Sequence, residues 1–519
     1  MNLEQLPENT EPIRPGNPET GAPFWNGCSP KFIYPPAFDF EEQWMAKQYR
    51  FQIWAADGSI RTFFADKPWA PLTPVWKDLP VGRTVVLCEG INAENVVCIT
   101  NEPRLFWRDA PFTGDHPPKA RPYADAARLA YDFILSWPPF TKFLETGEPD
   151  RDYDKNGYPS KTHAATIQAM ATCADRMPGC RDKALRLARL AGEFLVRTAC
   201  APGTPLEHWP LTYTTAHGQA CQHPECEGTI MLIYPFDVGM AFLDLAEATG
   251  ERRWIDAAER IAATAMRTRR EDGSWPLVLD IATGRPTTPN TLVPDRPMLF
   301  FEALARATGN DAYEQTARDC FTQIETGILK DWAWEGQFED VQPGRKYTNL
   351  TKHSACNVMS YLLRRFPGDA RYLAIARDII RFAEDQFVFW ELPYRPEDAT
   401  CVFPRFKSGS GGRGANFHVP CCVEQFDCFN PVDASAAKLV RSWIDYGKAA
   451  HDGRALAKAR AMADSMTRIQ MPNGFIPTWW WAKAPWWNGG RTGLDNDPWI
   501  NCHIASANTL AAAAESLGD

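Results

Sequence analysis

The sequence has neither a hydrophobic run long enough to cross a membrane nor a basic cluster. No apolar stretch in the 519 residues reaches the roughly 18 residues that a membrane-spanning helix needs. The formal net charge is -9, and no run of lysine and arginine stands out against it. We therefore expect neither a membrane nor a nucleic acid as a partner. No heptad pattern predicts an oligomeric state.

The N-terminal segment lacks the pattern of a secretion signal. Residues 1–24 are polar and rich in proline, without a basic stretch followed by an apolar one. The number of cysteines, 15, is odd, and several fall inside expected helices, where buried free thiols are common. These features argue against a disulfide framework and favour a reducing, cytoplasmic compartment. A secreted chain whose signal has been removed is the alternative.

What the sequence does contain is a repeated helical hairpin. Between Tyr234 and Met266, two stretches with helical apolar spacing are separated by Gly250, which suits the left-handed end of a helix. In two further copies, as in this one, an aromatic residue stands four positions after the glycine and an alanine eight positions after it. The other hinge glycines are Gly179, Gly309, Gly368 and Gly453. Five copies in register indicate an internal repeat.

Apolar periodicity predicts twelve helices in the second part of the chain. They span residues 121–137, 161–176, 182–199, 231–249, 252–269, 296–308, 311–326, 351–365, 369–387, 433–451, 454–470 and 501–517. Pairing through the glycines makes five hairpins, and packing the first helix on the last makes a sixth. A closed ring lets each repeat bury the apolar face that it cannot bury alone. This pattern resembles the (α/α)6 barrel of the six-hairpin glycosidase superfamily, which implies an enzyme acting on carbohydrate.

The chain before the helices has a different pattern. Short β-like runs such as YRFQIWA and RTVVLCEGI are bounded by turn sequences, which is typical of a small antiparallel β-sandwich. We predict an extended arm over residues 1–24, a β-sandwich-like domain over 25–115 and the barrel over 120–519. The expected role of the β-domain is to pack on the barrel, and Trp25, Trp69 and Trp76 leave direct sugar binding as the alternative.

Polar residues occupy the predicted starts of the inner helices. In a ring of hairpins these starts converge at one mouth of the barrel, so their side chains form a candidate site. The residues are Lys161, His163, Tyr234, Asp237, Asp295, Arg296, Lys352, His353, Glu424, Asp427, Asp433, Asn501 and His503. Helix capping is the alternative for each one alone, above all for Asp295 and Asp433. Their convergence favours a site.

The loops expected around this mouth are rich in tryptophan. Indoles held at a surface usually mark a binding site, and the apolar faces of pyranose rings stack on them. Packing of these loops against the barrel is the alternative. The predicted substrate contacts are Trp334, Trp479, Trp480, Trp481 and Trp487, together with Tyr234, Arg296, Asp433 and His503.

The carboxylates of this region favour glycoside hydrolysis. That reaction needs two carboxyl groups, one protonated and one ionised, on either side of the glycosidic bond. We expect Glu424 or Glu339 to be the general acid, with Asp237 or Asp340 as its partner. An acidic sugar of the glucuronide type is the expected substrate feature, because four cations are available for it: Arg296, Arg345, Lys346 and Lys352.

Three other functions remain open at this stage. A polysaccharide lyase would cleave a uronic-acid glycan by β-elimination, with Tyr347 or His353 as the base and Arg296 or Asn349 neutralising the substrate carboxylate. A non-catalytic glycan-binding protein would need none of the carboxylates. A sugar epimerase is the third.

Two clusters resemble metal sites, although the expected chemistry requires no cofactor. Asp152, Asp154 and Asn156 have the spacing of the first half of a calcium loop, but His163 stands where a bidentate glutamate is expected. An Asx-rich turn is the alternative. The second cluster has ligand types that suit a structural zinc at a spacing that no standard finger uses. It consists of His217, Cys221, His223 and Cys226.

Overall fold

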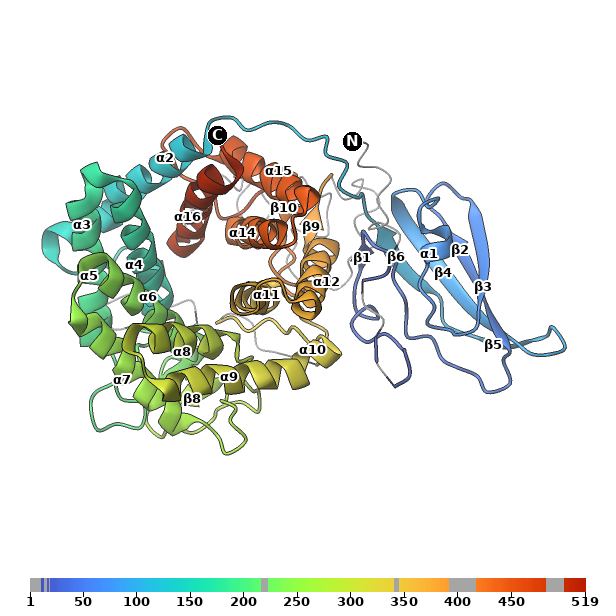
Figure 1. Ribbon diagram of the computed structural model, residues 1–519, viewed down its shortest axis with the longest axis horizontal. Coiled ribbons are helices and arrows are strands. Elements are labelled where there is room, and N and C mark those ends of the chain that lie inside the picture. Colours follow the sequence, from blue (N-terminus) through green and yellow to red (C-terminus); the bar gives the residue numbers. More distant parts are fainter. Residues whose placement is uncertain are drawn as a thin grey trace.

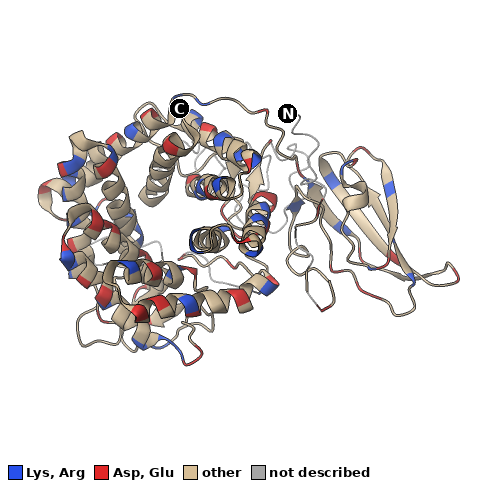
Figure 2. Cartoon of the chain, viewed as in Figure 1, with Lys and Arg blue, Asp and Glu red and all other residues tan. Residues whose placement is uncertain are grey.

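The computed structural model describes residues 11–13, 16–17, 19–215, 223–339, 345–391, 417–481 and 499–519. Its larger part is a closed ring of helical hairpins, and a twisted sheet lies beside the ring (Figure 1). Among the described residues, no helix is both long and apolar enough to cross a bilayer. Acidic and basic residues are interspersed along the outer helices (Figure 2).

The ring has an inner and an outer layer of six helices each, which confirms the predicted (α/α)6 toroid. The inner helices are α4 (Pro159–Arg176), α6 (Ile233–Thr249), α8 (Asp295–Thr308), α11 (His353–Arg365), α14 (Asp433–Ala449) and α16 (Ile500–Leu517). The outer helices are α2 (Tyr123–Ser136), α5 (Arg181–Arg197), α7 (Arg252–Thr268), α9 (Asp311–Thr326), α12 (Ala370–Phe387) and α15 (Gly453–Ile469). Helix α2 packs against α16 and closes the ring.

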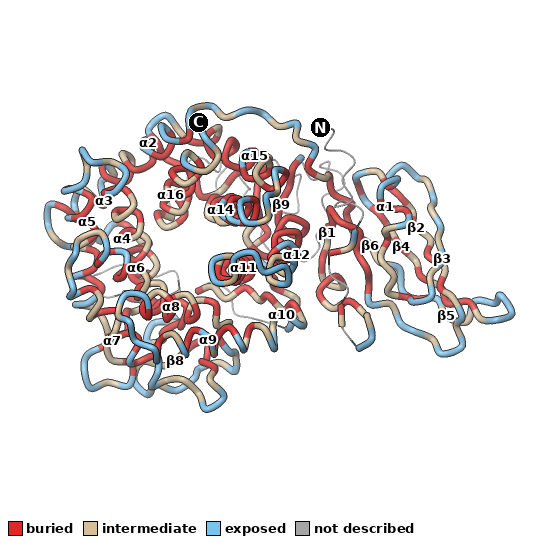
Figure 3. The backbone as a smooth tube through the Cα atoms, viewed as in Figure 1, coloured by how far each residue is buried: buried red, intermediate tan, exposed pale blue. Residues whose placement is uncertain are grey.

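Small residues allow the helices to approach closely. A Cβ atom on Gly239 of α6 would lie 2.3 Å from the Phe300 ring of α8, and one on Gly192 of α5 would lie 2.9 Å from the Trp254 ring of α7. Trp254 is the aromatic residue of the repeat, so the repeated position marks a contact between neighbouring outer helices. Buried residues form a nearly continuous layer between the inner and outer helices (Figure 3).

The hinge glycines do not all play the same part. Gly250, Gly309 and Gly368 have positive φ angles of 72°, 71° and 78°, as predicted for left-handed helix ends. Gly453 is instead the first residue of α15, and Gly179 lies in a short 3-10 helix. At these two positions the glycine is not a left-handed helix end, and in the turn before Gly453 the left-handed residue is His451, with a φ angle of 52°.

Shorter elements fill the connections between the long helices. Helix α3 (Pro138–Thr146) lies between α2 and α4, and α10 (Ile328–Asp331) follows α9. Two-stranded pairs join β7 (Thr229–Met231) to β8 (Val278–Asp280) and β9 (Val388–Phe389) to β10 (Cys421–Cys422).

The N-terminal strands form one six-stranded sheet in the order β1-β6-β4-β2-β3, with β5 also paired to β4. The strands are β1 (Lys31–Phe32), β2 (Gln48–Trp54), β3 (Ile60–Ala65), β4 (Gly82–Ile91), β5 (Val97–Thr100) and β6 (Arg104–Arg108). All pairs are antiparallel except β1 with β6. Helix α1 (Thr73–Trp76), rather than a second sheet, packs on it, through stacking of Trp76 on Phe106. Trp25 and Trp76 are buried, which leaves neither indole open to a sugar.

A buried polar network joins the sheet to the ring. Lys31 on β1 donates from Nζ to the backbone oxygens of Asp385 (2.6 Å) and Val388 (2.9 Å) and pairs with Asp109 at 3.0 Å. The Asp385 side chain, on outer helix α12, accepts the backbone N–H groups of Ile33 and Tyr34. Strand β1 therefore lies directly against α12 (Figure 1).

Candidate active site

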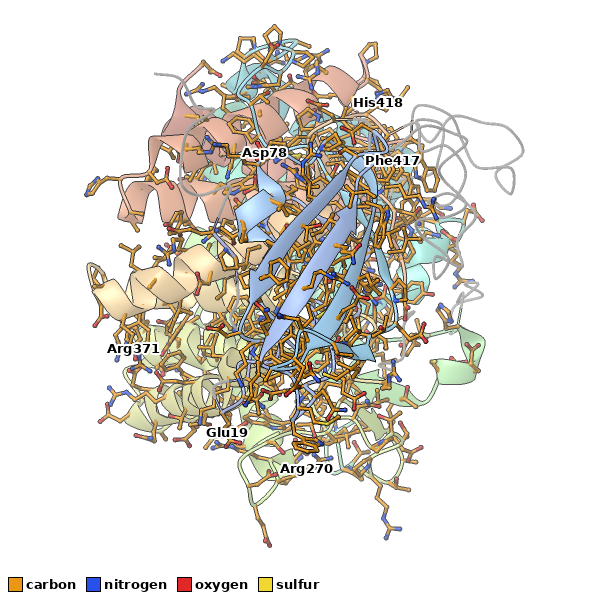
Figure 4. The ribbon with its side chains drawn as sticks, turned by 90° about the vertical axis from the view of Figure 1, so that its right-hand side faces the viewer. Glu19, Asp78, Arg270, Arg371, Phe417 and His418 are labelled. Atoms are coloured by element: carbon orange, nitrogen blue, oxygen red, sulfur yellow. The ribbon has the colours of Figure 1, made fainter. Side chains whose placement is uncertain are left out.

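A cavity of about 500 Å³ lies inside the ring and is lined by all six inner helices. It extends from their first turns, at Lys161, Arg296 and His353, to residues well inside the barrel such as Asp445. Phe417, on a loop before α14, and Arg371, in the first turn of α12, lie on opposite sides of the barrel (Figure 4).

The inner helices begin at one mouth without side-chain caps. Among the described residues, none of the six has a hydrogen bond from its N-cap side chain to its first turn. Asp295 and Asp433 are the first helical residues rather than N-caps. By contrast, the outer helices α9, α12 and α15 are capped by Asn310, Asp369 and Asp452.

Glu424 reaches the cavity from the segment that precedes α14. Its side chain lines the cavity and is partly exposed. Its backbone N–H donates to the Asn430 oxygen at 3.0 Å. Its carbonyl oxygen accepts the Lys352 ammonium at 2.7 Å and the Thr351 hydroxyl at 3.1 Å. The backbone of Glu424 is therefore held from both sides while its carboxyl group faces the cavity.

Asp237 lines the cavity in the second turn of α6 and forms an ion pair with Arg296 of α8. Both side chains keep about a fifth of their surface exposed, at 23% and 22%. Burial raises the pKa of the Asp237 carboxyl, and the Arg296 guanidinium opposes that shift. Asp237 thus combines access to the cavity with a carboxyl that holds its proton more tightly than a free aspartate.

A chain of polar contacts continues from Arg296 to α14. The Arg296 Nε atom lies 3.5 Å from Asp295, and the buried Asp295 carboxylate accepts the side-chain amide of Asn357 at 2.7 Å. Lys438 of α14 donates to the oxygen of the same amide. Burial and the charge of Arg296 lower the pKa of Lys438 to about 8.

Asn357 and Lys438 were not predicted from the sequence. A signal for them exists on α14, where Lys438, Arg441 and Asp445 follow Ala434 and Ala437 at helical spacing and all line the cavity. Polar residues that follow small residues at helical spacing on an inner helix therefore indicate the part of the cavity wall below the first turn.

Glu339 is buried behind the cavity wall, with 3% of its surface exposed. Its carboxylate accepts hydrogen bonds from Lys161 of α4 and from the Tyr234 hydroxyl of α6, both of which line the cavity. Burial alone would raise the pKa of Glu339, but the Lys161 charge and these hydrogen bonds outweigh it, so the pKa lies below its usual value. An ionised carboxylate fixing two cavity residues does not suit the expected role of general acid.

His353 lines the cavity at the start of α11, as expected. Its Nε2 atom lies 3.4 Å from the Ser435 hydroxyl, and its ring meets the Phe338 ring edge-on. Burial and the nearby charges of Lys352 and Lys438 lower its pKa well below the usual histidine value. The imidazole is therefore neutral at neutral pH.

Two predicted polar contacts of the substrate point away from the cavity. Both ring nitrogens of His503 are engaged within the core, where Nδ1 accepts the Ile476 N–H at 3.1 Å and Nε2 lies 3.0 Å from the Ala130 oxygen. Asp433 is fully buried and accepts the Ser506 hydroxyl at 3.1 Å. The prediction that these residues bind substrate is wrong, because both are satisfied inside the helix packing.

Most of the predicted aromatic contacts pack the loops. Trp334 and Trp480 have no exposed surface, and Trp481 has 2%. Trp479 is half-buried and stacks on Trp481 at a centroid distance of 5.1 Å. Tyr347 stacks on Phe24 rather than facing the cavity. The prediction of exposed stacking indoles is therefore wrong for the three buried tryptophans, whose rings fill the space between the loops and the barrel.

The described members of the calcium and zinc clusters contact other protein groups. Asp152 pairs with Lys142 at 3.6 Å and Asp154 with Lys155 at 2.7 Å, while Asn156 donates to the Asp150 oxygen. Both carboxylates thus lie beside lysines, and the calcium site stays a prediction. His223 lies 3.1 Å from Glu225. No group of three or more metal-binding side chains occurs in the described part of the chain.

Four predicted residues lie outside the described residues: Asp340, Trp487, His217 and Cys221. Asp427, in the same segment as Glu424, is exposed and does not line the cavity.

The ring of six hairpins around a polar cavity is an (α/α)6 barrel. No protein-family model and no curated protein matches the chain. A family 76 glycoside hydrolase from a bovine Bacteroides thetaiotaomicron strain is similar in structure, with a TM-score of 0.50 and 10% identity over 93% of this chain and 99% of that one. The cellobiose 2-epimerase of Spirochaeta thermophila has a TM-score of 0.51 and 13% identity over 76% and 98%. At these identities the similarity shows the fold.

Proposed function

We propose that this protein is a glycoside hydrolase whose two working carboxyl groups are Asp237 and Glu424. The observation that carries the proposal is their position. Both side chains line the same cavity, Asp237 from α6 and Glu424 from the segment that leads into α14, a helix three places from α6 in the ring of six. Hydrolysis requires two carboxyl groups on either side of the scissile bond.

The surroundings of the two groups support different roles. The pKa of Asp237 is raised by burial, which suits the proton donor to the leaving oxygen. Glu424 lies beside the Lys352 ammonium, which favours its ionised form and suits the base or nucleophile. These roles are the reverse of the assignment expected from the sequence.

The cations near the mouth of the cavity are paired or turned away from it, which supports a neutral glycan there, while Lys438 and Arg441 of α14 add positive charge deeper in the cavity. Arg296 is paired with Asp237, Lys161 with Glu339 and Arg364 with Glu302. Of the other cations expected to bind an acidic sugar, Lys346 pairs with Asp331, Lys352 is buried among neutral acceptors, and Arg345 does not line the cavity. The cavity volume, about 500 Å³, suits a short stretch of sugar rings. One structural neighbour is named a glycoside hydrolase, which agrees with this chemistry.

Proton abstraction by His353 is the second candidate. A neutral imidazole in the cavity can act as a base in epimerisation or in β-elimination, and the other neighbour is named a cellobiose 2-epimerase. Tyr347, the other base expected for a lyase, does not line the cavity.

A panel of neutral and uronic-acid glycans distinguishes these functions. For a hydrolase we expect release of reducing ends without absorbance at about 235 nm, where an unsaturated uronate would absorb. The variants Asp237→Asn and Glu424→Gln should each lose activity by about 10²–10⁴-fold. Asp427→Asn, which changes an exposed carboxylate of the same segment, is the matched control. Absorbance would identify a lyase, and a new epimer without new reducing ends an epimerase. Full activity in both carboxylate variants would overturn the proposal.

A further inference from the structure

Lys352, the residue before α11, is held in one place by neutral acceptors. Its side chain has no exposed surface. Its Nζ atom donates to the Val423 oxygen at 2.6 Å, the Glu424 oxygen at 2.7 Å and the Ser435 hydroxyl at 2.6 Å. Three donated hydrogen bonds require an ammonium group, because a neutral amine has only two N–H bonds.

These acceptors belong to the segment that carries Glu424 and to the first turn of α14. Thr351 supports the same segment by a backbone pairing with Gln425 and by donating its hydroxyl to the Glu424 oxygen at 3.1 Å. The side chain of Glu424 leaves this fixed backbone toward the cavity. Loss of the Lys352 contacts would therefore free the point from which the carboxyl group projects.

The positive charge of Lys352 has no carboxylate partner in the described part of the chain. Its ammonium group lies over the Phe387 ring, 5.2 Å from the centroid. A buried charge held by carbonyl and hydroxyl oxygens is weakly screened, so it acts on the neighbouring Glu424 carboxyl. Asp433 of α14 and Cys502 of α16 also interact electrostatically with Glu424, and the thiols of Cys422, Cys356 and Cys428 lie near Lys352.

We infer that Lys352 is a positioning residue, which fixes the backbone of Glu424 and keeps the Glu424 carboxyl group ionised. The inference rests on the proposed function of Glu424 and adds a second requirement to it: the working carboxylate depends on a cation that never contacts the substrate. Burial lowers the pKa of Lys352 itself, so the three hydrogen bonds that the ammonium group donates are needed to keep Lys352 protonated.

The test is the pH dependence of kcat/KM in two variants that remove the charge, Lys352→Met and Lys352→Gln. The glutamine retains a hydrogen-bond donor, so it provides a folded variant if methionine disturbs the segment. We expect kcat to fall about 10- to 100-fold with little change in KM. The acid limb, which reports protonation of Glu424, should move to higher pH by about one unit or more, because the cation that favours the carboxylate is gone.

Thr351→Val is the matched control, since it removes one hydrogen bond to the same carbonyl oxygen without changing a charge. Its kcat should fall while its acid limb stays in place. An unshifted acid limb in a folded Lys352 variant would overturn the inference, because a purely structural role changes the amount of active protein and not its titration. Full activity in Glu424→Gln would instead overturn the proposed function, so the two failures are distinguishable.

Discussion

Two glutamates of one loop, Glu335 and Glu339, show how differently burial acts on a carboxyl group. Glu339 has Lys161 as an ion-pair partner, and its pKa is lowered despite burial. The Oε1 atom of Glu335 accepts the Tyr347 N–H, while its buried Oε2 atom has no hydrogen-bond partner in the described part of the chain. Burial raises the pKa of Glu335 to about 7. The pKa values of the two glutamates therefore differ because Lys161 pairs with Glu339, and not because one carboxyl group is more deeply buried.

Glu335→Gln should therefore make stability less dependent on pH. The native pKa of about 7 lies above the unfolded value, so the contribution of Glu335 to stability is full below pH about 4 and is lost as the pH rises through 7. Glutamine keeps the acceptor for Tyr347 and carries no charge. We expect the variant to match the parent at about pH 4 and to exceed it by about 2–4 kcal/mol at pH 8, measured by urea unfolding.

Glu339→Gln provides the comparison, because the same change there removes a paired charge. This variant should be less stable than the parent at pH 7, and the difference should shrink as the pH falls through the lowered pKa of Glu339. Equal pH profiles for the parent and Glu335→Gln would show that Glu335 titrates as an ordinary exposed carboxyl group.

At the scale of helices, contact between α6 and α8 depends on the absence of a side chain at Gly239. Gly239→Ala would place its methyl group 2.3 Å from the Phe300 ring and should cost about 1–3 kcal/mol by overpacking. Because α6 also carries Asp237, we expect loss of activity together with loss of stability. Thermal unfolding and kcat/KM measure the two effects.

Gly250→Ala is a suitable counterpart at the end of the same helix. No atom lies within 4 Å of the added Cβ, and the cost, about 1–2 kcal/mol, comes from the left-handed backbone alone. Activity at a temperature where the variant is folded should be unchanged. A Gly239→Ala protein as stable and active as its parent would contradict the close packing of α6 on α8.

The helices could be predicted from the sequence because their repeat is local. All twelve predicted helices are present, and each boundary lies within two residues of the prediction. The inner-helix starts gave Lys161, Tyr234, Asp237, Arg296, His353 and Glu424 as cavity residues for the same reason, since ring geometry follows from the order of the hairpins.

The loop residues could not be predicted in the same way. Whether Trp334 or Trp480 is exposed depends on how a long loop packs on the barrel, and neither residue lies in a periodic pattern. The role of Glu339 depends on Lys161, which is 178 positions away in the chain. Lys438 lies below the first turn of α14, in the deeper part of the cavity, and the pattern of helix starts does not indicate residues at that depth.

At the scale of the whole molecule, the sheet and the ring should unfold together. Their junction contains Lys31, which has no exposed side-chain surface and bonds to Asp109 and to the carbonyl groups that end α12. Lys31→Met would leave the buried Asp109 charge without this partner, at a cost of about 3–5 kcal/mol. We expect one lowered transition, seen alike by far-ultraviolet circular dichroism and by tryptophan fluorescence.

Lys67→Met is the control on the same sheet. Lys67 pairs with Glu42 at 2.6 Å, but both side chains are about half exposed, at 54% and 44%. Surface pairs contribute about 0–1 kcal/mol, so the transition should hardly move. Two separate transitions in the parent protein would show instead that the junction does not couple the sheet to the ring.

The parallel arrangement of the six inner helices, whose N-termini lack side-chain caps, gives the barrel a dipole along its axis. Peptide dipoles in each helix sum to roughly half a positive elementary charge at the N-terminus and half a negative one at the C-terminus. All six inner helices run the same way, so these partial charges add at the mouth near Glu424 and have the opposite sign at the other mouth. The electrostatic potential inside the cavity is therefore more positive at the Glu424 end than at the other end. This difference attracts the electron-rich part of a bound sugar toward the Glu424 end, and added salt weakens the attraction.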